Sequence, residues 1–266
     1  MRGKKVMVVI LCALLLFEAL AFTFVSLGQQ KALADPGEET FYSTASDGYL
    51  KKGDTIYNWA HDAANAEEVN DSDYVLIIGQ LCPICYIWRS ALFFDTSSLP
   101  DGVDITSATL SLYGDYDWSV ADFDITVVDG SLLNDPLIAG DYGYLGGQTI
   151  SGGAFNTSGF LEDVYNDIPL NAAGMGWISK TGMTQFGLRS SRDINANEPS
   201  GDEEIVWVYS YEQGEGYRPK LVVTYEYPPT GVPTMSQWGM IGMAIVLAAF
   251  LAWSVRRRLV ASAGKS

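Results

Sequence analysis

Short runs of alternating apolar and polar residues constrain the fold of this chain more than any other feature. The runs at residues 108–113, 123–128, 185–189, 205–211 and 220–225 place apolar side chains at every second position and are rich in β-branched and aromatic residues. This period of two is typical of strands with one buried face, and Gly, Pro, Asn and Asp residues fill the gaps. The pattern predicts an all-β fold, an antiparallel jelly-roll-like β-sandwich. The Gly-rich residues 140–159 predict a long loop, and residues 160–168 at most two helical turns.

The N-terminal segment has the features of an export signal. Arg2, Lys4 and Lys5 precede an apolar run over residues 6–27, and Ala32-Leu33-Ala34 precedes Asp35 as a small-x-small cleavage site. We therefore expect residues 1–34 to be a signal peptide that signal peptidase removes. An uncleaved membrane anchor is the alternative, because the apolar run is long for a signal peptide. Either possibility places the following segment outside the cytoplasm.

The C-terminal segment carries a second apolar run. Residues 239–255 hold no charge, Trp238 and Trp253 lie at the two ends of the run, and Arg256, Arg257 and Arg258 follow. Seventeen residues of helix just span a hydrocarbon core of ~30 Å. The run therefore predicts a single transmembrane helix, with residues 259–266 as a cytoplasmic tail by the positive-inside rule.

The residues before this run give it a more specific interpretation. The motif Val232-Pro233-Thr234-Met235-Ser236-Gln237-Trp238-Gly239 and its Arg cluster resemble the IPTL-CTERM sorting signal of Gram-negative bacteria, a relative of PEP-CTERM. Pro233, Thr234, Trp238 and Gly239 match that pattern, whereas Val232 and Met235 stand where the family has Ile and Leu. The resemblance implies that residues 230–258 are recognised by an exosortase-type transpeptidase in the inner membrane. Cleavage would then send the protein to the cell surface, the envelope or the medium.

The charge of the intervening segment limits its partners. Residues 35–229, enough for one domain, hold 31 Asp and Glu residues against 8 Lys and Arg residues, a net charge of −23. Such a surface repels phosphate backbones and argues against nucleic-acid binding. It is compatible with binding of divalent cations, and the i, i+2 pairs Asp115 with Asp117 and Asp122 with Asp124 are weak candidates for a structural calcium site. No other cofactor is expected.

Two cysteines remain after the signal segment. Cys82 and Cys85 lie between strand-like runs at residues 74–78 and 86–94, which places them at a hairpin turn. A C-x-x-C pair can be half a zinc site, a redox pair or a local disulfide. We expect the disulfide, because the chain has no second ligand pair and because a redox pair opens a helix after a strand.

Several blocks of the domain share a second family resemblance. Residues 89–113, 184–193, 209–211 and 218–225, with a weaker match at residues 47–51, look like the signature of DNRLRE-type domains over about residues 40–227. The resemblance implies a secreted β-sandwich related to carbohydrate-binding modules, some of which bind acidic polysaccharides such as alginate. Arg89 and Arg189 lie in these blocks, and we expect each to pair with a carboxylate, since an unpaired buried charge is costly.

Aromatic residues supply the candidate ligand contacts. Sugar rings stack their C–H faces on aromatic rings, and we select Tyr116, Trp118, Trp207 and Tyr209 as stacking candidates. The alternative is that these rings pack between the two sheets. His61 is the only histidine and has no nucleophile motif beside it, so we expect no catalysis.

These observations predict an exported, surface-sorted, non-catalytic β-sandwich protein that binds extracellular polysaccharide or acts in the envelope or biofilm matrix. A structural or adhesive surface protein with a protein partner is the alternative, and a polysaccharide-degrading enzyme is a third.

Overall fold

The computed structural model of the chain describes residues 36–199, 203–228 and 237–263. They belong to two units. Asp35–Pro228 is a compact unit built of strands, whereas Met1–Ala34 and Pro229–Ser266 form the other unit, whose described part is helix α6 (Gln237–Ala263). The predicted cleavage residues Ala32, Ala34 and Asp35 and the motif residues 232–236 lie outside the described residues.

The compact unit consists mainly of strands. Its helices are short: α2 (Tyr57–His61), α3 (Asp141–Gly146), α4 (Ala172–Gly176) and α5 (Ser191–Ile194), with 3-10 turns η1 (Thr157–Gly159) and η2 (Tyr211–Gln213). The strands are β1 (Gly37–Tyr42), β2 (Gly48–Asp54), β3 (Glu68–Asn70), β4 (Val75–Leu81), β5 (Cys85–Asp95), β6 (Asp104–Ser119), β7 (Asp124–Asp129), β8 (Gly153–Asn156), β9 (Tyr165–Pro169), β10 (Met183–Ser190), β11 (Glu204–Tyr209) and β12 (Lys220–Glu226). All of their pairings are antiparallel, so the predicted all-β antiparallel fold is confirmed.

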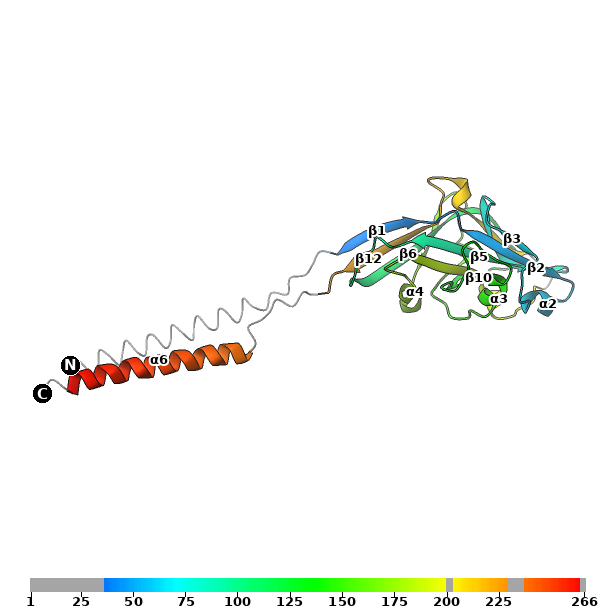
Figure 1. The fold of residues 1–266 in the computed structure, drawn as a ribbon. Coiled ribbons are helices and arrows are strands. Elements are labelled where there is room, and N and C mark those ends of the chain that lie inside the picture. The colour runs from blue at the N-terminus through cyan, green and yellow to red at the C-terminus, as the bar shows by residue number, and fades with distance from the viewer. Residues whose placement is uncertain (1–35, 200–202, 229–236, 264–266) are drawn as a thin grey trace. The chain divides into compact units, whose positions relative to one another are not determined.

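The strands form one hydrogen-bonded path that curls on itself (Figure 1). The order is β1-β12-β6-β11-β4-β5-β10-β7-β8, with β2 and β3 attached at β5 and with β9 attached at β6. Beyond the end of β1, Ser43 forms an isolated bridge to Phe94 of β5, which lies far along the path. The two parts of the path therefore face each other, as in a β-sandwich.

The main core lies between these facing parts. Leu110 of β6 and Leu221 of β12 belong to the same buried cluster as Leu92 of β5, Phe186 of β10 and Ile125 of β7. The alternation in the sequence explains this arrangement, because every second side chain of a strand points to the same face. Ala108, Leu110 and Leu112 of β6 are accordingly buried in this core, and Ile105 packs against it partly buried.

A second core covers the opposite face of β5. Leu50 of β2 and Ile87 and Phe93 of β5 pack with Tyr57 of α2 and Tyr142 of α3. Strand β5 therefore has apolar neighbours on both faces, which explains why its sequence is almost continuously apolar.

A buried ion cluster joins β5, β10 and α5. The Asp193 carboxylate accepts hydrogen bonds from Arg89 Nε at 2.9 Å, Arg89 Nη2 at 2.8 Å and Arg189 Nε at 2.6 Å. All three side chains are inaccessible to solvent or nearly so, and the predicted pairing of each arginine with a carboxylate is confirmed. Burial alone would raise the pKa of Asp193, but the two guanidinium groups outweigh it and lower that pKa to about 2.

The Gly-rich segment is not the long loop that the sequence predicts. It contains α3 and β8, and the Asp141 carboxylate accepts hydrogen bonds from the backbone of Asn134 at 3.2 Å and of Ile138 at 2.8 Å. The expectation of helical turns within residues 160–168 is also wrong, because β9 begins at Tyr165 and pairs with β6. Ladder hydrogen bonds to a distant strand override local propensity in this segment.

The C-terminal apolar run is helical, as predicted. Helix α6 includes residues 239–255, and the Arg257 guanidinium lies 4.4 Å from the centre of the Trp253 ring. Within the described residues, no helix is both long enough and apolar enough to cross a membrane. The predicted transmembrane helix is therefore not supported, since its uncharged run is at the short limit of the length required.

The ion cluster should contribute strongly to stability. Replacing Asp193 by Asn leaves two buried guanidinium groups without a carboxylate, and we expect the free energy of unfolding to fall by about 3–5 kcal/mol. Urea denaturation of the wild type and of Asp193→Asn measures this difference. The matched control is Glu68→Gln, which removes the half-exposed pair with Lys51 and should cost under about 1 kcal/mol.

The pH dependence gives the same experiment a distinct signature. Because folding lowers the pKa of Asp193, its stabilisation is complete above the unfolded pKa of about 3.9 and is lost as the pH falls towards about 2. The difference between wild type and Asp193→Asn should therefore be constant from about pH 7 to pH 5 and shrink below about pH 4. Equal effects of the two substitutions at pH 7 would contradict the structural role of the cluster.

Candidate functional site

An aromatic hollow on the sheet surface is the best-formed candidate site. It encloses about 300 Å³ and is open to solvent. Its lining comes from five strands and is almost wholly apolar: Lys51 of β2, Ile77 and Leu81 of β4, Tyr86 and Trp88 of β5, Trp118 of β6, and Ile205 and Trp207 of β11. We call this set of eight residues the aromatic hollow.

The strand register brings these residues together. Trp118 lies opposite Ile205, Ile205 opposite Gly79, Gly79 opposite Trp88, and Trp88 opposite Lys51. This row crosses β6, β11, β4, β5 and β2 in turn. A neighbouring row places Trp207 opposite Ile77. Residues directly opposite each other in a ladder share a face, so the backbone pairing fixes the position of each ring.

Gly79 lies in the first of these rows, between Ile205 and Trp88. Its φ is +134°, and a Cβ atom added there would lie 1.9 Å from the carbonyl oxygen of Glu204. Only glycine adopts this conformation without strain, and only glycine permits such a close approach of β4 to β11. The glycine therefore lets the backbones of β4 and β11 lie close together at this point of the row.

Lys51 is the only charged residue in the lining, and its charge is already paired. Its ammonium group forms an ion pair with Glu68 of β3 and lies 5.6 Å from the centre of the Tyr86 ring. The hydrogen bond from Lys51 lowers the pKa of Glu68, so the carboxylate is ionised at neutral pH. The lining of the hollow is therefore close to neutral.

Three of the four predicted stacking residues lie at this surface. Trp118 and Trp207 line the hollow, and Tyr116 contacts Trp207 edge to face with a centroid distance of 6.2 Å. Trp118 and Tyr116 are 44% and 47% exposed, so their rings do not pack between the sheets.

Sequence reasoning did not select Tyr86 and Trp88. Their alternation along β5, directly after the cysteine hairpin, was a usable signal, but only the register with β4 shows that they face the hollow.

The fourth predicted residue, Tyr209, belongs to a separate tyrosine cluster. Its ring stacks on Tyr113 at 5.7 Å and meets Tyr217 edge to face at 5.6 Å, while Tyr165 packs against Tyr113 at 5.0 Å. The Asp115 carboxylate beside the Tyr209 hydroxyl raises the pKa of that tyrosine to about 12. These rings mostly contact one another, and the cluster has a packing role.

The predicted calcium ligands do not converge among the described residues. Asp117 accepts a hydrogen bond from the Ser119 amide at 2.9 Å, Asp124 accepts one from Asn156 at 2.8 Å, and Asp122 accepts one from Thr157 at 3.3 Å. None of these carboxylates belongs to a described group of three or more potential ligands. Structural calcium at these residues stays a prediction with no geometric support.

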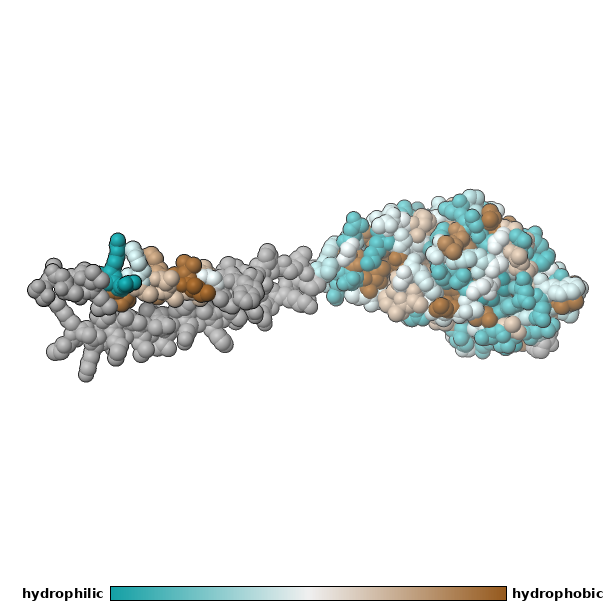
Figure 2. All heavy atoms as spheres, turned by 60° about the horizontal axis from the view of Figure 1, so that its bottom comes forward, coloured by the Kyte–Doolittle hydropathy of each residue, from teal (hydrophilic) through white to brown (hydrophobic). Residues whose placement is uncertain are grey.

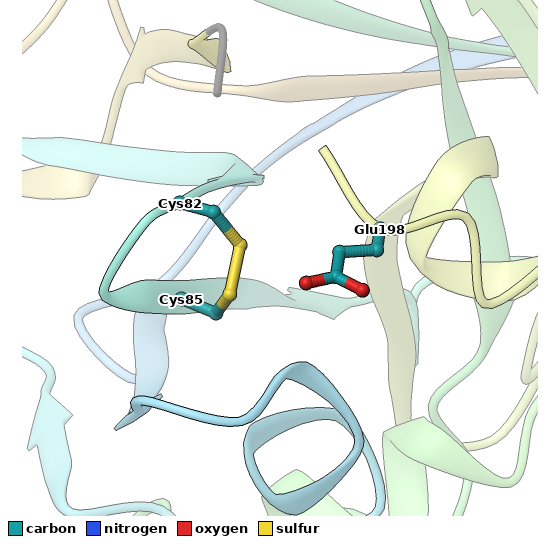
Figure 3. A group of neighbouring side chains, drawn as sticks. All are labelled: Cys82, Cys85 and Glu198. Carbon is teal, nitrogen blue, oxygen red and sulfur yellow. A yellow bond between two sulfur atoms is a disulfide. The ribbon is translucent and has the colours of Figure 1, made fainter. Parts of the chain in front are cut away.

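The cysteines form a disulfide at the turn between β4 and β5 (Figure 3). The Sγ atoms of Cys82 and Cys85 are 2.01 Å apart, and the Glu198 carboxylate points towards them. The three side chains are close enough to surround a metal ion. Cysteines in a disulfide offer no thiolate, however, so this group does not bind a metal in its oxidised form.

His61 lies at a second hollow, of about 420 Å³, between the end of α2 and α3. The lining is His61, Asp62, Ala63, Ala64, Gly140, Gly143, Gly146 and Gly147. The imidazole Nε2 is 2.8 Å from the carbonyl oxygen of Asp193, and Nδ1 is 2.5 Å from the Asp62 carboxylate. This lining contains no hydroxyl or thiol nucleophile, so its described residues do not form a catalytic triad.

Comparison with known proteins identifies no family for this chain. No protein-family profile matches the chain, and a search of curated proteins finds no match. The resemblances to DNRLRE-type domains and to the sorting signal therefore have no support from family comparison.

One similar solved structure comes from a study of the structural basis for the promiscuous specificity of carbohydrate-binding modules from the β-sandwich superfamily. The sequence identity is 10% and the TM-score is 0.21. The match covers 74% of this chain and 57% of that one. At this TM-score the match carries no argument about the site.

One face of the strand unit shows how its surface hydrophobic residues are distributed. On the face that Figure 2 shows, the hydrophobic residues of the strand unit lie in small separate groups among hydrophilic ones. Scattered apolar residues need no functional explanation, whereas three tryptophans that share one hollow do.

The close approach of β4 to β11 beneath this row can be tested through Gly79. We expect Gly79→Ala to lower the free energy of unfolding by about 2 kcal/mol or more, because alanine is strained at this φ and meets the Glu204 carbonyl. Gly176→Ala is the matched control, since an added Cβ there meets no atom within 4 Å, and it should change stability by less than about 1 kcal/mol. Chemical denaturation distinguishes them, and similar values for both variants would show that β4 and β11 are not this close.

Proposed function

We propose that this chain is an exported, non-catalytic protein whose jelly-roll-like β-sandwich unit binds extracellular polysaccharide through the aromatic hollow. The observation that carries the proposal is the convergence of Trp88, Trp118 and Trp207 on one solvent-open surface. Indole rings offer flat apolar faces to the C–H faces of sugar rings. Their N–H groups remain available for hydrogen bonds to hydroxyl groups.

The shape and chemistry of the hollow favour binding over catalysis. A general acid and a general base must both lie within reach of the scissile bond, and glycoside hydrolysis requires two placed carboxyl groups. The described lining offers a single ionisable side chain besides Tyr86, and that side chain, Lys51, is already paired with Glu68. This composition supports a site that binds its ligand without altering it chemically.

The proposed location rests on the two ends of the chain and on the cysteines. The basic N-terminal residues, the apolar run and the small-x-small site support export by a signal peptide. The disulfide between Cys82 and Cys85 supports an oxidising compartment. The motif at residues 232–239 supports sorting by an exosortase-type transpeptidase to the cell surface, the envelope or the medium.

Affinity electrophoresis tests the binding function. The unit of residues 35–228, which contains both cores, is run through gels that hold neutral or acidic polysaccharides. We expect retardation by at least one polysaccharide, and we expect Trp118→Ala and Trp207→Ala each to weaken it about three- to tenfold.

The control for this experiment is Trp59→Ala. Trp59 lies in α2, is 64% exposed and is outside the hollow, so its loss should leave the retardation unchanged. Normal migration of the folded unit in every gel would refute polysaccharide binding and support the structural or adhesive alternative.

A further inference from the structure

The two outer tryptophans of the hollow lie on strands that are three positions apart in the sheet. Trp118 is on β6 and Trp88 is on β5, and β11 and β4 lie between them. Three strand separations of about 4.8 Å place the two backbones about 14 Å apart. A six-membered ring with bonds of about 1.5 Å is only about 5 Å long with its attached oxygens. A sugar chain that follows this row from one strand to the other therefore spans about three rings.

The row between the two tryptophans carries little exposed side chain. Ile205 and Gly79 occupy its intermediate positions. Ile205 is only 2% exposed, and Gly79 has no side chain, so neither blocks the row. A chain can therefore run along the row from one tryptophan to the other.

The charges around the hollow disfavour an anionic ligand. A bound carboxylate or sulfate needs a cation, and the only cation in the lining, Lys51, already pairs with Glu68. Residues 35–229 also carry a net charge of −23, which repels anions at longer range. An uncharged chain avoids both costs.

We propose that the hollow binds a segment of an uncharged linear polysaccharide that runs across the strands from Trp118 to Trp88 and spans at least about three sugar rings. This inference rests on the proposed polysaccharide binding and specifies its ligand class. It differs from the acidic ligand class that the family resemblance implies. Trp207, beside the row, contacts a middle ring of the segment.

Matched oligosaccharides test both the length and the charge of the ligand. The probes are β-1,4-linked glucose and mannose oligomers from disaccharide to hexasaccharide, and β-1,4-linked mannuronate oligomers of the same lengths. Mannuronate differs from mannose only by a carboxylate at C6. Calorimetric titration of the full-length chain should show neutral tetrasaccharides binding at least about tenfold more tightly than disaccharides, with the mannuronates weaker at each length.

The variants show whether one ligand contacts both indoles. Trp88→Ala and Trp118→Ala should each weaken hexasaccharide binding, whereas the disaccharide reaches only one indole and should be sensitive to only one substitution. If Trp88→Ala does not fold, Trp88→Phe replaces it and should give a smaller loss in the same direction. Trp59→Ala again serves as the control.

The outcomes separate this inference from the proposed function. In one outcome, a polysaccharide retards the wild type but not Trp118→Ala, while disaccharide and hexasaccharide bind with equal affinity. That result would support the proposed function and overturn the multi-ring site. Tighter binding of mannuronate than of mannose oligomers, or binding of no neutral oligomer, would overturn the uncharged ligand. Failure of every polysaccharide to retard the protein would overturn the function itself.

Discussion

The architecture of the sheet depends on the buried Asp193 carboxylate, which forms ion pairs with both Arg89 and Arg189. Strand β5 pairs with β4 through residues 86–88 and with β10 through residues 90–95. Arg89 therefore lies where the pairing partner of β5 changes from β4 to β10. Arg189 comes from β10, and Asp193 follows it on α5. Two buried guanidinium groups are tolerated only with a carboxylate between them, which ties these three elements at the fork in the sheet.

The same fork determines where the aromatic rings lie. Arg89 points into the second core, where its guanidinium stacks 4.0 Å from the centre of the Tyr142 ring. Side chains alternate along a strand, so Tyr86 and Trp88 cannot share that core and instead face the hollow. The hollow is therefore built on paired backbone rather than on loops. Its rings are held in place before a ligand arrives, which reduces the entropy cost of binding.

The sequence predicted the local features of this fold and missed the long-range ones. Alternation identified strands such as β6 and β12, and the cost of an unpaired buried charge predicted partners for Arg89 and Arg189. Alternation does not say which strands pair, so nothing local shows that Trp118 and Trp88 share a row with Ile205. Helices such as α3 are too short to show a period of 3.6 residues, and a Gly-rich sequence hides them.

Tryptophan indole signals in nuclear magnetic resonance test the central claim most directly, because the strand unit contains both hollow and non-hollow tryptophans. The full-length chain with isotope-labelled tryptophan would be titrated with a neutral polysaccharide, with each indole assigned by substitution. We expect the Nε1–H signals of Trp88, Trp118 and Trp207 to shift together, while those of Trp59 and Trp177 stay in place. Shifts confined to Trp59 or Trp177, or no shift in any indole when the polysaccharide binds, would contradict a binding site in the aromatic hollow.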